Sequence, residues 1–170
     1  MNGNIEFQIK NGNGKGKEYN LKEFFDEHYL IFEGEYLNGV RNGKGKEYDY
    51  YGSLSFEGEY LNGERNGKGK EYDIHNGSLS FEDEYLNGVR NGKGKQYDIY
   101  NGSLSFEGEY LNGERNGKGK GYNKDGKLLF ESEYLNGEIN GKGKEYDING
   151  KLLFEGEYFN RKRWNGKVKV

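Results

Sequence analysis

The chain of 170 residues contains no cysteine and no proline. Without cysteine, it is neither a disulfide-stabilised scaffold nor a protein with a cysteine-ligated zinc site. Without proline, it does not form collagen, although glycine accounts for 30 residues. No apolar run approaches the ~20 residues of a membrane-spanning helix, and Met1 leads into no secretory signal. We therefore expect a cytoplasmic protein, either free or peripheral to a membrane.

An excess of charge of one sign is also lacking, because 26 basic residues face 29 acidic residues, for a net charge of −3. Electrostatic capture of nucleic acid needs a clear basic excess, so we expect no nucleic-acid partner. Aromatic residues, in contrast, make up 16% of the chain, whereas disordered chains are poor in them. The composition predicts a folded, β-rich protein of about one domain's length.

One phrase recurs along the whole chain. Phe-Glu-Gly-Glu-Tyr or a close variant starts at intervals of 24 or 25 residues, at Phe32, Phe56, Phe81, Phe106, Phe130 and Phe154. Two copies depart at the central glycine, which Asp83 and Ser132 replace, while residues 53–70 and 103–120 are identical. We predict a single repeat domain over residues 1–170. Residues 1–31 form an incomplete first repeat with a capping insertion, 32–160 form six repeats, the last one irregular, and 161–170 form a basic C-terminal edge.

Within a copy, residues alternate with a period of two, which indicates β-strands. Phe56, Gly58 and Tyr60 fall on one face of an extended segment, and the two intervening glutamates fall on the other. Asn-Gly pairs follow, and these are typical of hairpin turns, in which both central residues take a positive φ. A second strand is predicted at about residues 67–74. We expect Gly58 and Gly69 to let aromatic rings lie flat on the neighbouring backbone.

These elements predict an all-β fold of tandem β-hairpin repeats, forming an elongated, twisted, single-layer antiparallel meander sheet. An isolated repeat buries too few apolar side chains to offset the conformational entropy lost on ordering its backbone. Stability is therefore expected to come from the stacking of neighbouring repeats.

The spacing Phe56-x-Gly58-x-Tyr60-x-x-Gly63-x-x-x-Gly67-x-Gly69 resembles the MORN repeat, whose pattern is aromatic-x-Gly-x-aromatic-x-x-Gly-x-x-x-Gly-x-Gly. The resemblance is weak over residues 3–19 and strong over 32–160, and the period and residues 149–154 are closest to the MORN-variant repeats of bacteria. The resemblance implies a hairpin ribbon that acts as a scaffold, a docking surface or a membrane-associated organiser. It does not imply an enzyme.

Residues 20–31 are four or five residues longer than the other connections. Leu21, Phe24, Phe25 and His28 follow helical spacing, which allows one or two helical turns. The alternative is a lengthened hairpin with residues 26–28 at its tip. In either case, Phe24 and Phe25 are expected to cover the first edge of the sheet.

Every charge after Glu157 is basic. One interpretation is a contact site for an anionic group, either a lipid headgroup, a nucleic acid or an acidic partner. The interpretation we favour is a charged edge strand that discourages further strand pairing. The residues concerned are Arg161, Lys162, Arg163, Lys167 and Lys169.

No group of side chains predicts catalysis, a metal site or a cofactor. His28 and His75 are expected in turns, and the repeated glutamate pairs are expected to face solvent beside lysines. Asn-Gly-Lys-Gly-Lys lacks the spacing of a phosphate-binding loop. We therefore expect a protein that is not an enzyme and holds neither a cofactor nor a metal.

The strongest candidate binding surface is a row of tyrosines with one member per repeat. The interpretation we favour for these rings is that they stack on each other only as core, and the alternative is a groove that also binds a partner. The leading hypothesis is a non-catalytic protein–protein interaction or scaffold module that presents an aromatic groove to a helix or an extended peptide. Alternatives are a peripheral binder of anionic membranes and an antitoxin- or immunity-like inhibitor of a partner protein. Exposed strand edges also allow a homodimer. The row consists of Tyr36, Tyr60, Tyr85, Tyr110, Tyr134 and Tyr158.

Overall fold

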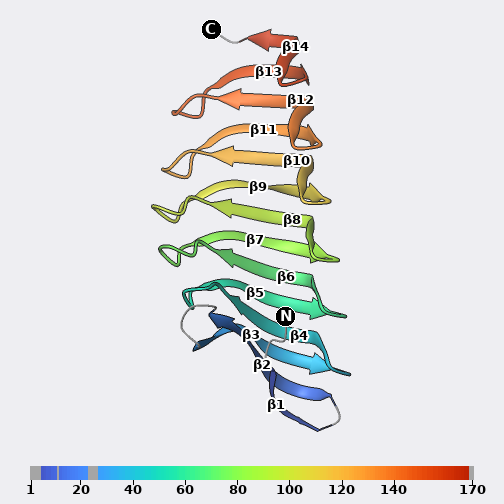
Figure 1. Cartoon of the computed structure of the whole chain (residues 1–170). Helices are drawn as coiled ribbons and strands as arrows, with labels where there is room; N and C mark the ends of the chain where they lie inside the picture. Colours follow the sequence, from blue (N-terminus) through green and yellow to red (C-terminus); the bar gives the residue numbers. More distant parts are fainter. Residues whose placement is uncertain (1–4, 11, 23–26, 169–170) are drawn as a thin grey trace. The chain divides into compact units, whose positions relative to one another are not determined.

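The computed structural model describes residues 5–10, 12–22 and 27–168. These residues form fourteen β-strands (Figure 1). The described part contains no helix, and therefore none that is long and apolar enough to cross a membrane. The prediction of an all-β antiparallel meander built from hairpins is confirmed.

The chain divides into two compact units. The first comprises residues 1–79 and 85–88, and the second comprises residues 80–84 and 89–170. The residues of β7 (Leu79–Leu86) are shared between the two. Our assignment of all 170 residues to one domain stays a prediction.

Each unit is an antiparallel meander in which every strand pairs with its neighbours in the chain. The first unit contains β1 (Ile5–Lys10), β2 (Asn13–Lys22), β3 (Glu27–Leu37), β4 (Val40–Tyr48), β5 (Leu54–Leu61) and β6 (Glu64–Tyr72). The second contains β8 (Val89–Tyr97), β9 (Leu104–Leu111), β10 (Glu114–Tyr122), β11 (Leu128–Leu135), β12 (Glu138–Tyr146), β13 (Leu152–Phe159) and β14 (Lys162–Val168).

The first Asn-Gly pair of each repeat forms the hairpin turn. Between β5 and β6, Leu61 pairs with Glu64, which leaves a two-residue loop of Asn62 and Gly63. Their φ angles are 52° and 93°, as a type I′ turn requires. This part of the turn prediction is confirmed.

The pair Asn66-Gly67 does not form a turn, and the strand that contains it differs from the predicted one. Gly67 also has a positive φ, of 91°, but it lies inside β6, which runs from Glu64 to Tyr72 rather than over residues 67–74. The pairing with β5 jumps from Tyr60–Arg65 to Gly58–Gly69, so this segment is a β-bulge. A bulge and a turn both need a residue with positive φ, which is why the sequence pattern did not separate them.

The opposite ends of the hairpins are closed by an acidic or amide side chain. Asp73 Oδ1 accepts hydrogen bonds from the backbone N–H groups of His75 and Asn76, both at 3.1 Å. Asp49, Asp98, Asn123 and Asp147 bond the backbone of their own loops in the same way. Asp73 and His75 therefore belong to a capped turn.

The long connection at residues 20–31 is extended wherever it is described. β2 continues to Lys22 and β3 begins at Glu27, with Leu21 paired to His28. The hairpin alternative therefore holds for these residues, although Glu27 and His28 lie in a strand and not at the tip. Phe24 and Phe25, which we expected to cover the first edge, lie outside the described residues.

A single-layer sheet can bury a phenylalanine here because glycine removes the side chains beneath the ring. Phe56 is 0% exposed, and its ring lies over the paired residues Gly58 and Gly69 of β5 and β6. A Cβ atom on Gly69 would lie 2.5 Å from Phe56 Cζ, well inside contact distance. The predicted packing of rings over glycine is confirmed, and it places the core on one face of the sheet, which we call the aromatic face.

Candidate functional site

On the aromatic face of the first unit, each buried phenylalanine is enclosed by tyrosine and arginine. The ring of Phe56 meets the rings of Tyr60 and Tyr85 edge-on, at centroid distances of 5.8 and 5.3 Å. The guanidinium of Arg65 lies over the same ring, 3.9 Å from its centroid. Solvent is therefore excluded from the ring, because the backbone lies below it, the tyrosines lie at its sides and the arginine lies above it. Phe32 is enclosed in the same way by Tyr36, Tyr60 and Arg41.

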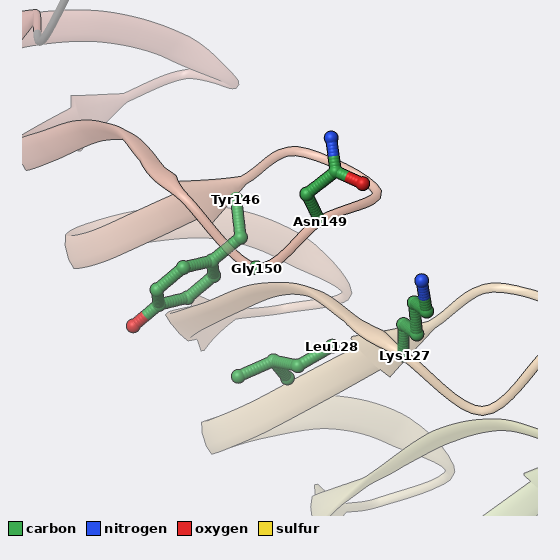
Figure 2. Close-up of a pocket in the computed structure, with 5 residues that line it drawn as sticks. All are labelled: Lys127, Leu128, Tyr146, Asn149 and Gly150. Carbon is green, nitrogen blue, oxygen red and sulfur yellow. The ribbon is translucent and has the colours of Figure 1, made fainter.

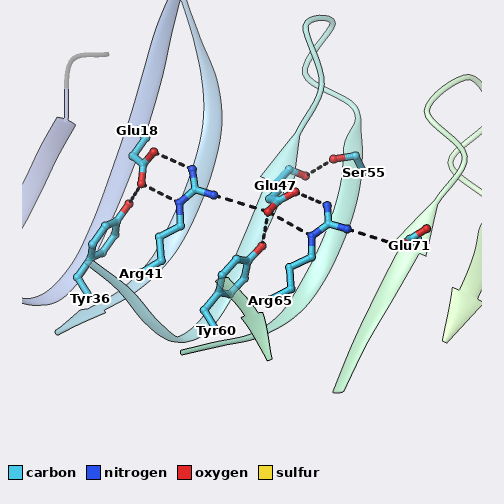
Figure 3. Close-up of polar contacts among 8 residues, drawn as sticks. All are labelled: Glu18, Tyr36, Arg41, Glu47, Ser55, Tyr60, Arg65 and Glu71. Atoms are coloured by element: carbon cyan, nitrogen blue, oxygen red, sulfur yellow. Dashed lines mark hydrogen bonds and ion pairs between the residues drawn. The ribbon is translucent and has the colours of Figure 1, made fainter. Parts of the chain in front are cut away.

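The arginines are in turn fixed by glutamates (Figure 3). Glu18 accepts hydrogen bonds from the Tyr36 hydroxyl at 2.5 Å and from Arg41 Nε and Nη2 at 2.9 and 2.7 Å. Glu47 repeats this arrangement with Tyr60, at 2.7 Å, and with Arg65. A bidentate arginine and a tyrosine hydroxyl on one carboxylate form a charge-assisted, directional contact.

Neighbouring groups of glutamate, tyrosine and arginine are connected to each other. Arg41 Nη1 lies 3.6 Å from Glu47 Oε1, and Arg65 Nη1 lies 3.5 Å from Glu71 Oε1 (Figure 3). Each of these arginines therefore lies between two glutamates, one from the preceding repeat and one from its own. We call this alternation of Glu, Tyr and Arg the polar ladder.

The polar ladder shifts the pKa values of its members in opposite directions. Although burial raises it, the hydrogen bonds from Arg65 and Tyr60 hold the pKa of Glu47 below its usual value of 4.5. Burial and the hydrogen bond to Glu47 raise the pKa of Tyr60 well above 10. At neutral pH the glutamate is thus ionised and the tyrosine protonated, as the hydrogen bond requires.

The structure brings the predicted tyrosine row onto the aromatic face, but as buried side chains. All six members are only 4–6% exposed. Sequence reasoning missed the arginines that lie over the neighbouring phenylalanines, although an arginine recurs at the same position in successive copies, at Arg41, Arg65, Arg90 and Arg115. Its partners are distant in sequence, since Arg41 and Glu18 lie 23 residues apart.

The opposite face of the sheet carries a simpler pattern of glutamate, lysine and tyrosine. Tyr48 donates a hydrogen bond to Glu33 at 2.7 Å, and burial together with this bond raises the pKa of Tyr48 to about 12. In the first five phrases the second glutamate bonds the backbone of the bulge. Glu59, for example, accepts from the backbone N–H of Lys68 at 3.1 Å. The expected cross-strand pairing is confirmed for Glu57 and Lys70, whereas Glu59 bonds the backbone of Lys68.

Two repeats of the second unit depart from this geometry at the central glycine. Asp83 replaces glycine, is 4% exposed, and places Oδ2 3.0 Å from Arg90 Nε. Arg90 lies over Phe81, 3.5 Å from the ring centroid. The ring of Phe81 is only partly buried, because a side chain now stands where glycine left room.

At Ser132 a group of linked substitutions restores the packing. The ring of Phe130 lies against Gly121, with which it is paired, rather than over position 132. In the first unit, Glu47 occupies the position that Gly121 takes here. Ile139 stands at the arginine position and packs with Phe130 beside the core cluster. Gly121 and Ile139 therefore replace a glutamate and an arginine of the polar ladder, and their contacts are apolar.

The basic C-terminal residues are largely bound within the chain or exposed on an edge. Arg161 lies 2.7 Å from Glu138, and Arg163 bonds Glu145 and lies over the Phe154 ring. Lys162 and Lys167 lie in β14, of which every residue described is exposed. Lys169 lies outside the described residues. Whether these cations also contact lipid stays a prediction.

A shallow cavity of about 400 Å³ opens between two loops of the second unit (Figure 2). Its lining residues are Lys127, Leu128, Tyr146, Asn149 and Gly150. They include no carboxylate or histidine, and Tyr146 is bonded to Glu131 at 2.9 Å. Among the described residues, no group of three or more acidic or histidine side chains is placed to hold a metal ion.

The family model for the MORN repeat matches residues 32–50, 56–73, 84–98, 106–126 and 130–151, which is more than half of the chain. The chain belongs to the MORN repeat family. No curated protein matches it. MORN repeats are in general non-enzymatic modules that interact with proteins or membranes. The resemblance to the bacterial variant stays a prediction.

Proposed function

We propose that this MORN repeat chain is a non-catalytic protein–protein interaction module that binds a helix or an extended peptide along its aromatic face. The observation that carries the proposal is the row of arginines over the phenylalanine rings. The side chains of Arg41 and Arg65 keep 24% and 26% of their surface exposed. The solvent side of this face therefore presents guanidinium groups framed by the edges of tyrosine rings.

This surface is prepared for binding because its side chains are already ordered. Hydrogen bonds to Glu18 and Glu47 fix the two guanidinium groups. Ordering flexible side chains is one of the main free-energy costs of association. Here these side chains are already ordered when the chain folds, so binding does not add this cost. Arginine and tyrosine are also the residues most enriched at interfaces and their hot spots.

Two substitutions, one on each face of the sheet, test the proposal. Arg65→Lys keeps the charge on the aromatic face but loses the planar fork, whereas Lys70→Arg alters the opposite face. We expect cross-linked protein partners from a cell extract to fall about tenfold with Arg65→Lys, equivalent to ~1.4 kcal/mol, and to persist with Lys70→Arg. Circular dichroism checks that both variants fold. If no protein is captured, or if only Lys70→Arg reduces capture, the proposal is wrong.

A further inference from the structure

Arg65 and Arg115 have the same sequence around them but different charges beside them. They occupy equivalent positions in the identical segments 53–70 and 103–120. Arg65 lies between Glu47 and Glu71, the residues paired with Phe56 on its two sides. The residues paired with Phe106 are instead Gln96 and Gly121. Both acids that flank Arg65 are thus missing around Arg115.

The contacts of Arg115 do not replace the missing charges. Its guanidinium lies over Phe106, 3.7 Å from the ring centroid, and Nη2 donates to Gln96 Oε1 at 2.7 Å. Within the part of the chain that the structure describes, Arg115 makes no ion pair. The buried carboxylate of Asp83 pairs with Arg90 instead. Arg115 is therefore a half-buried cation that lacks the counter-charge its equivalents have.

A tyrosine hydroxyl beside Arg115 is also unsatisfied. Tyr36, Tyr60 and Tyr158 each donate to a glutamate. Tyr110 is 6% exposed, and no described residue accepts a hydrogen bond from its hydroxyl, because the neighbouring Arg115 is only a donor. A buried hydroxyl without an acceptor costs free energy, so a bound acceptor would be favoured here.

The electrostatics keep these hydroxyls available as donors. Burial raises the pKa of Tyr110, although the neighbouring Arg115 guanidinium opposes the rise. The same two effects act on the pKa of Tyr134. Both phenols therefore remain protonated at neutral pH, on either side of one guanidinium.

We propose that Arg115, with the hydroxyl of Tyr110, binds the carboxylate of an acidic side chain supplied by a partner polypeptide. The inference rests on the proposed interaction function and names the chemistry of the partner. The chain itself contains the template: the Glu47 carboxylate accepts from Tyr60 and from two nitrogens of Arg65. A planar group with two oxygens fits this arrangement, and the partner would supply the acid that the chain lacks at position 96.

Nuclear magnetic resonance of the full chain tests the site, with the Arg115 side-chain Nε–H as reporter. The probes are the acetylated, amidated peptides Gly-Glu-Gly and Gly-Gln-Gly, and inorganic phosphate is a third arm. We expect a saturable shift at Arg115 with the glutamate peptide, about tenfold tighter (~1.4 kcal/mol) than with the glutamine peptide, since a charge-assisted hydrogen bond is roughly twice as strong as a neutral one. Arg65, already paired twice, should not respond.

The variant Gln96→Glu separates binding from folding. It rebuilds the arrangement of Glu47 from the chain's own side chain, so it should weaken the glutamate peptide about tenfold while raising the thermal midpoint. Equal affinity for both peptides, an equal response at Arg65, or binding unchanged by Gln96→Glu would overturn the inference. If phosphate bound with the same affinity as the glutamate peptide, the assignment to a carboxylate would be wrong. Partner capture that depends on Arg65 but not on Arg115 would leave the proposed function standing without this site.

Discussion

Substitution of Gly58 by serine should expel the ring of Phe56 from the aromatic face. A Cβ atom at Gly58 would lie 2.6 Å from Phe56 Cζ and 2.8 Å from the backbone oxygen of Lys68. Full burial of a phenylalanine contributes about 1.5–3 kcal/mol, and its contact with the Arg65 guanidinium adds about 0.5–1 kcal/mol. Each edge contact with a tyrosine adds about 0.5–1.5 kcal/mol. Since the displaced ring keeps part of its contacts, we expect Gly58→Ser to lower the free energy of unfolding by about 3–5 kcal/mol.

The second unit indicates how this loss can be recovered. There, Ser132 is accompanied by Gly121 and Ile139, and the phenylalanine ring lies against Gly121. The corresponding changes around Gly58 are Glu47→Gly and Arg65→Ile. We expect the triple variant to recover about half or more of the stability that Gly58→Ser loses, because the ring regains a backbone site and an apolar neighbour.

Urea unfolding of the full chain measures these differences, and the Hα shift of Gly69, which lies under the Phe56 ring, reports the position of the ring. Gly63→Ala is the matched control, because an added Cβ there meets nothing within 4 Å and acts only through its φ of 93°. It should cost about 1–2 kcal/mol. Equal costs for Gly58→Ser and Gly63→Ala, or a triple variant no more stable than the single one, would refute the packing argument.

Two further predictions concern the glutamates of the two faces. Although burial raises it, the pKa of Glu47 is held below 4.5 by Arg65 and Tyr60, so its stabilising contribution is present above that value and is lost as the pH falls through the lowered pKa. The difference in unfolding free energy between the wild type and Glu47→Gln should thus be constant from pH 7 to about 5 and shrink below 4.5; a difference independent of pH would contradict it. Glu59→Ala removes the acceptor of the exposed Lys68 N–H, so it should cost about 0.5–1.5 kcal/mol and speed hydrogen exchange at Lys68, whereas an unchanged exchange rate would contradict this assignment.

The features that could be predicted from the sequence are those with local causes. The turn at Asn62 and Gly63 depends on the φ preferences of those two residues. Alternation along β5 places Phe56 and Tyr60 on one face whatever the neighbouring strand contains. Gly58, two residues after Phe56, indicated the ring packing because a glycine on the same face leaves bare backbone on which an aromatic ring can lie.

The polar ladder could not be derived in this way, because its contacts cross from one repeat to the next. Arg65 reaches Glu47, 18 residues away, only after the bulge at Gly67 has shifted the register of β6 against β5. A bulge is a property of two paired strands, and the sequence of one strand does not determine it. For the same reason the tyrosine row looked like an open groove, whereas Arg41 and Arg65 cover the neighbouring phenylalanine rings.

In a repetitive chain, the substitutions that break the repeat pattern fall into two classes: those for which another contact compensates and those for which none does. The loss of glutamate at Gly121 is matched by the ring of Phe130, and the loss of arginine at Ile139 is matched by an apolar contact. The change to Gln96 has no such match, since it leaves the hydroxyl of Tyr110 without an acceptor among the described residues. Because an unsatisfied buried donor lowers stability, restoring the acid at position 96 should stabilise the chain. A position at which the chain is less stable than its own repeat allows is where we place the contact with a partner.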